Sequence, residues 1–125
     1  RSLAMEPGPL ILVGDETSIA VAAAYTLARP GAVRAVLEAG DPGEAERVAL
    51  AVGLREPTVV PRGAGADRYG PLVAAVLAAS RSQSASIGIT GNARLLQAVR
   101  AGGRSAGVPS VRVKAYWAEG KVGLD

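Results

Sequence analysis

The amino-acid sequence predicts an α/β domain, with a doubly wound, five-stranded parallel sheet and helices on both faces. Two features of the chain support this prediction. Short apolar runs alternate with longer segments of helical periodicity, and several runs are continuous instead of alternating with polar residues. A continuous apolar run is typical of a strand covered on both faces, and alternation with helices favours parallel strands joined by helical crossovers. The 125 residues, 49% of them apolar, suit one compact domain.

The first strand is expected at 10–13, an apolar run that ends at Gly14. The Asp-Glu-Thr-Ser sequence at 15–18 then offers capping oxygens and early negative charge to a helix over 19–27. That helix should stop near the Pro-Gly pair at 30–31, because neither residue continues a helix well.

A second strand is expected at 32–38, and the Gly-Asp-Pro-Gly sequence at 40–43 breaks it. Apolar residues then recur at the i, i+3, i+4 and i+7 spacing of one helix face. They are Ala45, Val48, Ala49 and Val52. The third strand is expected at 58–60, and the glycine-rich segment 62–67 that follows is interpreted as a flexible loop.

A third helix is expected to start near Pro71, and a fourth strand at 86–90. Asn92 can cap a fourth helix, which the glycine pair at 102–103 should end or fray. Apolar and polar residues alternate over 111–116, so a fifth strand is expected there, half exposed at an edge of the sheet.

The composition excludes several classes of site. The chain has no cysteine and no histidine, so no metal site built on thiolate or imidazole and no Ser-His-Asp triad is expected. The net charge of +3 comes from arginines spread along the chain, with only three tyrosines and one tryptophan to stack on bases. This pattern argues against nucleic acid as a partner.

No apolar run reaches the roughly 18 residues of a membrane span, and no signal-peptide pattern opens the chain. We therefore expect a cytoplasmic location. The chain begins at Arg1 and not at methionine, so it reads either as an excised domain or as a natural truncation. We expect a linker at 1–8, one domain at 9–117 and a tail at 118–125.

Ligands of doubly wound domains bind beyond the carboxyl ends of the strands, where the strand order reverses. Gly14, Asp15, Glu16 and Thr17 follow the first strand. A glycine there allows close approach of a ligand, and a helix N-terminus favours an anion. An ordinary capped helix start explains the same residues. The carboxylates of Asp15 and Glu16 repel a phosphate, so a phosphate would bind to the backbone amides that follow them.

Glu38 ends the second strand, where an acidic group can bond a ribose diol. Glu38 and Asp41 favour NADH, whereas Arg62 or Arg68 could serve the 2′-phosphate of NADPH. A solvated strand end is the alternative for Glu38. The glycines at 63 and 65 only half-match the dinucleotide fingerprint and follow the wrong strand.

The ends of the last two strands carry the remaining candidates. Thr90, Gly91 and Asn92 follow the fourth strand, and capping of the next helix is the alternative role of Asn92. Tyr116 and Trp117 are adjacent at the end of the fifth strand, where alternation points them to opposite faces. One of them could pack on a helix while the other covers a flat ring or a partner domain.

Two other folds with similar elements fit less well. A phosphoryl-accepting receiver domain needs an aspartate at the end of the third strand, where this chain has Val-Pro-Arg at 60–62. A helix-turn-helix over 89–108 would use the glycine pair at 102–103 as its turn, but the many strands elsewhere argue against it.

Three pieces together resemble the C-terminal half of siderophore-interacting proteins. They are the Leu-Ile-Leu-Val-Gly-Asp-Glu-Thr sequence at 10–17, the Gly-Asn-Ala at 91–93 and the Val-Lys-Ala-Tyr-Trp-Ala-Glu-Gly-Lys at 113–121. The first and last pieces are fairly specific in combination, and the resemblance extends over almost the whole chain.

The resemblance implies a ferredoxin-reductase-like nucleotide-binding domain of a flavin-dependent ferric-siderophore reductase. In that family an N-terminal barrel binds FAD, this half binds NADPH or NADH, and electrons pass through the flavin to ferric iron in a siderophore. The residues expected near the nucleotide, the flavin or the domain junction are Gly14, Asp15, Glu16, Thr17, Glu38, Thr90, Gly91, Asn92, Tyr116 and Trp117. The FAD-binding domain is absent from this chain, so the isolated domain should be inactive alone. The alternative is a stand-alone nucleotide-binding or partner-docking regulatory domain without catalysis.

Overall fold

The computed structural model describes residues 8–82, 84–91, 93–108 and 113–115. They form a five-stranded parallel sheet in the order β3-β2-β1-β4-β5. The strands are β1 (Leu10–Asp15), β2 (Val33–Ala39), β3 (Thr58–Pro61), β4 (Ser86–Ile89) and β5 (Val113–Ala115). The helices are α1 (Ile19–Ala28), α2 (Pro42–Ala51), α3 (Gly70–Ser82) and α4 (Ala93–Ala106), with short 3-10 turns η2 (Glu16–Ser18) and η3 (Gly65–Asp67). The predicted α/β class, a parallel sheet with helices, is confirmed.

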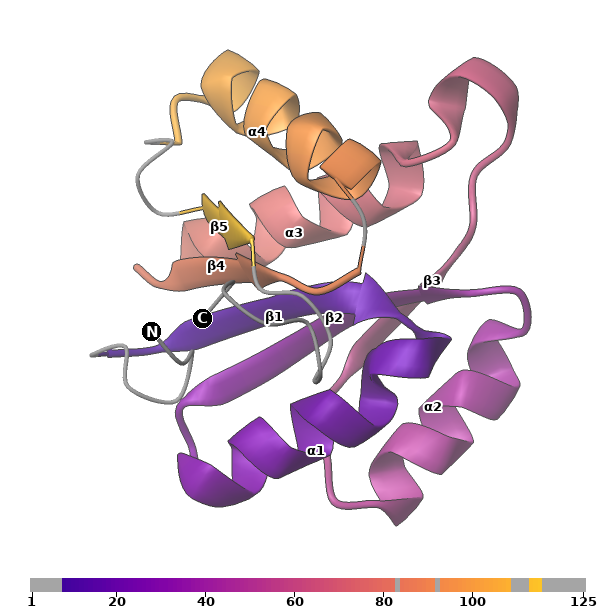
Figure 1. Cartoon of the computed structure of the whole chain (residues 1–125), viewed down its shortest axis with the longest axis vertical. Coiled ribbons are helices and arrows are strands. Elements are labelled where there is room, and N and C mark those ends of the chain that lie inside the picture. The colour runs from indigo at the N-terminus through magenta and orange to yellow at the C-terminus, as the bar shows by residue number, and fades with distance from the viewer. Residues whose placement is uncertain (1–7, 83, 92, 109–112, 116–125) are drawn as a thin grey trace.

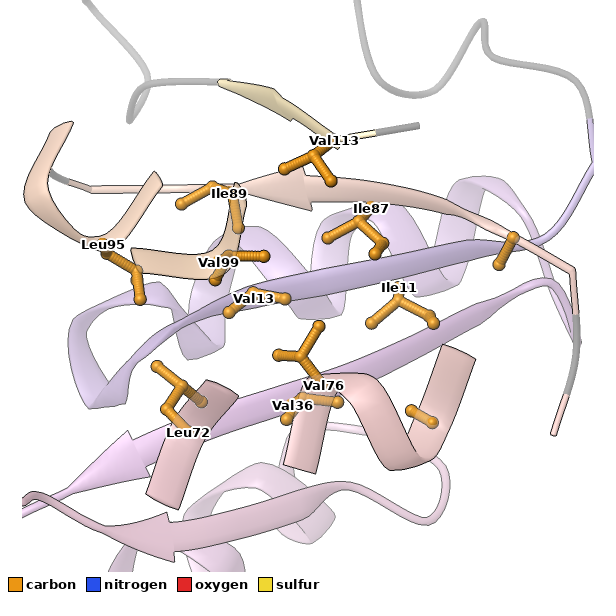
Figure 2. Packing of buried hydrophobic residues seen from close by; sticks show 12 residues of the cluster. Ile11, Val13, Val36, Leu72, Val76, Ile87, Ile89, Leu95, Val99 and Val113 are labelled. Carbon is orange, nitrogen blue, oxygen red and sulfur yellow. The ribbon is translucent and has the colours of Figure 1, made fainter. Parts of the chain in front are cut away.

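The helices cover both faces of the sheet, α1 and α2 on one side and α3 and α4 on the other (Figure 1). Successive side chains of β1 point to opposite faces of the sheet, as in any strand. Leu10 and Leu12 pack in the cluster with α1 and α2. Ile11 and Val13 pack in the cluster with α3 and α4, as Figure 2 shows. All four are fully buried, which explains why this strand reads as a continuous apolar run.

The strand order reverses beside β1. The chain moves outward from β1 to β2 and β3, and then returns to place β4 on the other side of β1. β1 is therefore hydrogen-bonded to both β2 and β4. In this arrangement the loops after β1 and β4 leave the sheet toward opposite faces, and a crevice can open between them. This reversal is the assumption on which the sequence-based choice of site residues depended.

Two strand and helix boundaries differ from expectation near this edge. β1 continues through Gly14 and Asp15, which pair with Leu37 and Glu38 of β2. α2 begins at Pro42, earlier than its apolar face suggested, because the Asp41 carboxylate accepts a hydrogen bond from the Glu44 amide at 3.1 Å. An aspartate cap followed by proline at the first helical position is a common helix start.

The expected end of α4 at the glycine pair was wrong. The helix continues through both glycines to Ala106. A methyl group on Gly102 would lie 2.5 Å from Cγ1 of Val73, so this glycine lets α4 approach α3 closely. Gly103 is buried on the same helix. The pair is thus a packing feature and not a turn, which also removes the helix-turn-helix alternative. The loop at 62–67 contains the η3 turn, and the Gly63 amide donates to the Arg68 carbonyl at 3.1 Å.

Candidate functional site

The reversal point is closed by two hydroxyl groups. The Ser18 and Thr90 side chains lie 2.7 Å apart and both residues are buried. The Thr90 hydroxyl donates to the Val13 carbonyl at 3.2 Å, and the Thr90 amide donates to the same oxygen at 2.9 Å. A hydroxyl has one hydrogen to donate, so the Ser18 hydroxyl donates to Thr90. This chain of bonds ties the loop after β1 to the loop after β4.

Gly14 is required by this closure. A methyl group at Gly14 would lie 2.4 Å from Ser18 Oγ and 2.5 Å from Thr90 Oγ1, nearer than such atoms can approach. Because Gly14 has no side chain, the hydroxyl groups of Ser18 and Thr90 have room to meet. Ser18 was not among the predicted site residues, because only the adjacency of β1 and β4 reveals its partner.

The turn after β1 has the predicted helix cap. Asp15 Oδ1 accepts hydrogen bonds from the Thr17 amide, at 2.8 Å, and from the Thr17 hydroxyl. The cap is confirmed, and contact of either residue with a nucleotide stays a prediction. The carboxylate already satisfies one amide at the amino end of η2 and α1.

Glu16 binds Arg62 across the end of β2. Its carboxylate accepts two hydrogen bonds from the Arg62 guanidinium, one of them 2.9 Å long from Nη1, and a third from the Gly40 amide at 3.3 Å. Asp15 Oδ2 lies 3.9 Å from the same guanidinium. The hydrogen bonds from Arg62 hold the pKa of Glu16 below its ordinary value, so this carboxylate is ionised at neutral pH. The loops after β1, β2 and β3 are thereby linked.

Glu38 forms a second bidentate pair, with Arg68. The two guanidinium nitrogens donate to its two oxygens at 2.8 and 2.9 Å. The Glu38 side chain is 4% exposed and that of Arg68 is 37% exposed. The guanidinium also lies 4.5 Å from the centre of the Tyr69 ring, within the range of a cation–π contact. Because both Glu38 oxygens are in use, a contact between Glu38 and a ribose stays a prediction.

The edge formed by β1, β2 and β3 carries more negative than positive charge. Four carboxylates and two guanidinium groups lie on it, and the paired ones form two fork-like contacts. The carboxylates belong to Asp15, Glu16, Glu38 and Asp41, and the guanidinium groups to Arg62 and Arg68. Sequence reasoning had left both arginines available for a phosphate, since it could not see which carboxylates face them.

The other side of the reversal point is more open. Gly91 is exposed and has φ +115°, a conformation that favours glycine, and nothing lies within 4 Å of where its side chain would begin. Thr90 contacts Ser18, so Thr90 and Gly91 lie beside the loop at 15–18, and contact of either residue with a nucleotide stays a prediction. Asn92, Tyr116 and Trp117 lie outside the described residues.

Two surface hollows lie away from this cluster, at the amino-terminal edge of the sheet. One hollow borders Pro9, Val33 and Arg55, and the other borders Leu27, Val52 and Arg55. The chemistry of the paired charges and the strand reversal, and not the size of a hollow, identify the carboxyl edge as the candidate site. Within the described ranges no group of three acidic side chains is placed to hold a metal ion, and no helix there is long and apolar enough to cross a membrane.

Comparisons with known proteins place the fold. No protein-family model matches the chain, and no curated protein matches it. The crystal structure of a flavohemoglobin from Malassezia yamatoensis, with bound FAD and heme, is similar over 90% of this chain, with a TM-score of 0.51 and 15% sequence identity. The matched part is 32% of the flavohemoglobin chain. The chain therefore has the fold of one part of a longer, FAD-containing protein.

Proposed function

We propose that this chain is the nicotinamide-nucleotide-binding unit of a flavin-linked oxidoreductase. The observation that carries the proposal is the strand reversal beside β1. It brings the loop at 14–18 and the loop that contains Thr90 and Gly91 side by side at the carboxyl edge, where the proposed nucleotide crevice would lie. Dinucleotides bind at this position in open parallel sheets. The structural likeness to part of an FAD-containing flavohemoglobin supports the same class of protein.

The residues at the crevice fit an extended nucleotide. Gly91 offers exposed backbone without a side chain, and α1 begins directly behind the cap formed by Asp15. The amides at the start of α1 favour the pyrophosphate. The Ser18–Thr90 bond keeps the two loops at a fixed separation, so the crevice is organised before the ligand arrives. A bound nicotinamide supplies the reducing equivalents, which a flavin on a separate domain would accept.

We assign NADH as the preferred nucleotide. A 2′-phosphate needs an available arginine near the end of β2. Arg62 is held by Glu16 and Arg68 by Glu38, each through two hydrogen bonds. A 2′-phosphate would have to displace one of these carboxylates from its arginine, whereas a ribose diol carries no charge and needs no available arginine.

The parent protein is proposed to be a ferric-siderophore reductase, with FAD on an N-terminal domain and a ferric siderophore as the substrate. This finer assignment depends on the sequence resemblance at 10–17, 91–93 and 113–121. Reduction of iron from the ferric to the ferrous state by one electron weakens its hold on hard oxygen ligands and releases it. In this arrangement the present chain positions the nucleotide and the other domain performs the reduction.

Calorimetric titration of the chain with NADH and with NADPH tests the nucleotide assignment. We expect saturable binding of one NADH per chain and weaker binding of NADPH. Glu16→Gln should release Arg62 and tighten NADPH binding by about tenfold, near the lower range for a hydrogen bond to a charged group. Glu46→Gln is the matched control, since Glu46 is an exposed carboxylate on α2 with no ion pair in the described part of the chain.

Tighter binding of NADPH than of NADH by the unaltered chain would refute the nucleotide preference. No binding of either nucleotide at millimolar concentration would refute the function itself. For the parent, NADH-driven reduction of a ferric siderophore by the full-length flavoprotein tests the substrate. Turnover of a soluble dye with no turnover of any ferric siderophore would overturn that part alone.

A further inference from the structure

The outer face of α1 lacks charge. No residue from Ile19 to Ala28 is ionisable except Tyr25, and the exposed positions include Ala20, Ala24 and Leu27. Leu27 is 82% exposed. A helix that is apolar all round is typical of one covered on every side. The described residues cover only the side that faces the sheet and α2, so the outer side is a candidate contact surface.

A hollow lies beside Leu27. It has a volume of about 410 Å³ and is bordered by Ala24, Leu27, Pro30 and Val52, with Arg55 at its end. Val52, just after α2, is itself 50% exposed. A second hollow of about 320 Å³ continues from it and shares Thr26 and Arg55. A protruding leucine and an apolar depression thus lie side by side on one surface.

Charges of both signs border the same surface. Across the described ranges the Arg55 guanidinium has no hydrogen bond or ion pair. The neighbouring Glu56 side chain is 89% exposed, and its contact with Arg34 is 4.0 Å long. Glu56 is also the one non-glycine residue with positive φ in the described part of the chain, at +50°. An unpaired cation and an almost unpaired anion stand next to each other at the end of an apolar groove.

We propose that this surface, defined by Ala24, Leu27, Val52, Arg55 and Glu56, binds a second copy of the chain. A two-fold axis makes each contact occur twice, residue i with residue j of the other copy and the reverse. Leu27 of each copy then enters the hollow of the other, and Arg55 of each copy pairs with the partner's Glu56. A partner with only one sign of charge would leave either Arg55 or Glu56 unpaired.

The position of the surface supports a second copy over a flavin domain. The groove lies at the amino-terminal edge of the sheet, where α1 ends and β2 begins. A flavin domain must approach the opposite edge to meet a nucleotide held there. Dimerisation through α1 therefore leaves the carboxyl edge accessible. The choice of a second copy over a flavin domain rests on the proposed function, whereas the test of dimerisation needs no nucleotide.

Sedimentation equilibrium over a concentration series tests the proposal. We expect a dimer that forms between about 10 and 500 μM chain, as befits a small interface. Leu27→Asp should raise the dissociation constant by at least about tenfold, because each dimer loses two apolar anchors. Leu50→Asp is the control, since Leu50 is likewise an exposed leucine, at 53% against 82% for Leu27, but borders neither hollow. Circular dichroism should show both variants folded.

A charge exchange tests the symmetry. Arg55→Glu and Glu56→Arg should each weaken the dimer, and the double variant should restore it, because the reciprocal pairs are re-formed with signs reversed. A monomer at every concentration up to about 1 mM would overturn the proposal. A dimer whose dissociation constant is unchanged by Leu27→Asp would overturn the assigned surface. The same conclusion would follow if the double charge-exchange variant did not regain the dimer affinity.

Discussion

Replacement of Gly14 by alanine should destabilise the fold through the hydroxyl pair that closes the reversal point. The added methyl would lie 2.4 Å from Ser18 Oγ, 2.9 Å from Ser18 Cβ and 2.5 Å from Thr90 Oγ1. Ser18 Cβ is fixed by the backbone, and the two hydroxyl oxygens are held by the hydrogen bonds that join Ser18, Thr90 and the Val13 carbonyl. Both hydroxyl-bearing residues are buried, so neither can move into solvent without separating the loops.

The expected cost follows from two contributions. Insertion of a methylene-sized group into a packed interior costs about 1–3 kcal/mol, and loss of the 2.7 Å Ser18–Thr90 hydrogen bond costs about 1 kcal/mol. Together the free energy of unfolding should fall by about 2–4 kcal/mol. Urea denaturation followed by circular dichroism measures this change, provided the slope of the transition is the same for both proteins.

Gly43→Ala is the matched control. Gly43 lies within α2, and a methyl there would meet only Asp41 Oδ1 at 3.8 Å, an ordinary contact. Alanine in a helix should stabilise by about 0.5–1 kcal/mol relative to glycine. Gly14→Ala should also cost less in a background of Ser18→Gly and Thr90→Ala, which removes the three clashing atoms. A Gly14→Ala protein within 0.5 kcal/mol of the unaltered one would refute this description of the closure.

Three other predictions concern the paired charges and α4. Arg68→Met leaves the buried Glu38 carboxylate without its bidentate partner. The free energy of unfolding, measured in urea, should fall by about 1–3 kcal/mol. This is less than for a fully buried pair, because the Arg68 side chain is 37% exposed. Gly102→Ala should lower the free energy of unfolding by about 1–2 kcal/mol, because the new methyl group clashes with Val73. In a double-mutant cycle, Val73→Ala should relieve part of this loss. If the losses of the two single variants simply add, the contact is contradicted. The pKa of Glu16 is lowered in the folded protein, so its stabilising contribution is present above its ordinary pKa and is lost as the pH falls through the folded value. Stability measured against pH should therefore fall less steeply below about pH 4.5 in Glu16→Gln than in the unaltered protein, and parallel curves would contradict the pair.

The sequence predicted the fold well because its strongest signals are local. Short continuous apolar runs such as the one at 10–13 are typical of a strand covered on both faces, and the structure buries that run completely. The helix cap at Asp15 was likewise visible from residue type and position. The expected end at Gly102 failed because close packing against Val73 in α3 outweighs the poor helix propensity of glycine.

The site was predicted only in outline. Strand ends could be identified, so Glu16, Glu38 and Thr90 were named from the sequence. Their partners could not be identified, because Arg62, Arg68 and Ser18 lie 46, 30 and 72 residues away along the chain. Pairing across such distances depends on strand order and on the facing directions of side chains, neither of which has a local sequence signal. This is why the choice between NADH and NADPH was open from the sequence.

Amide chemical-shift mapping of the chain with added NADH tests the central claim most directly. The account predicts saturable shifts at Gly14, Thr17, Gly40 and Gly91, around the crevice at the carboxyl edge, with little change at Arg55 on the opposite edge. Shifts confined to the amino-terminal edge, or none at millimolar NADH, would contradict a nucleotide site at the strand reversal.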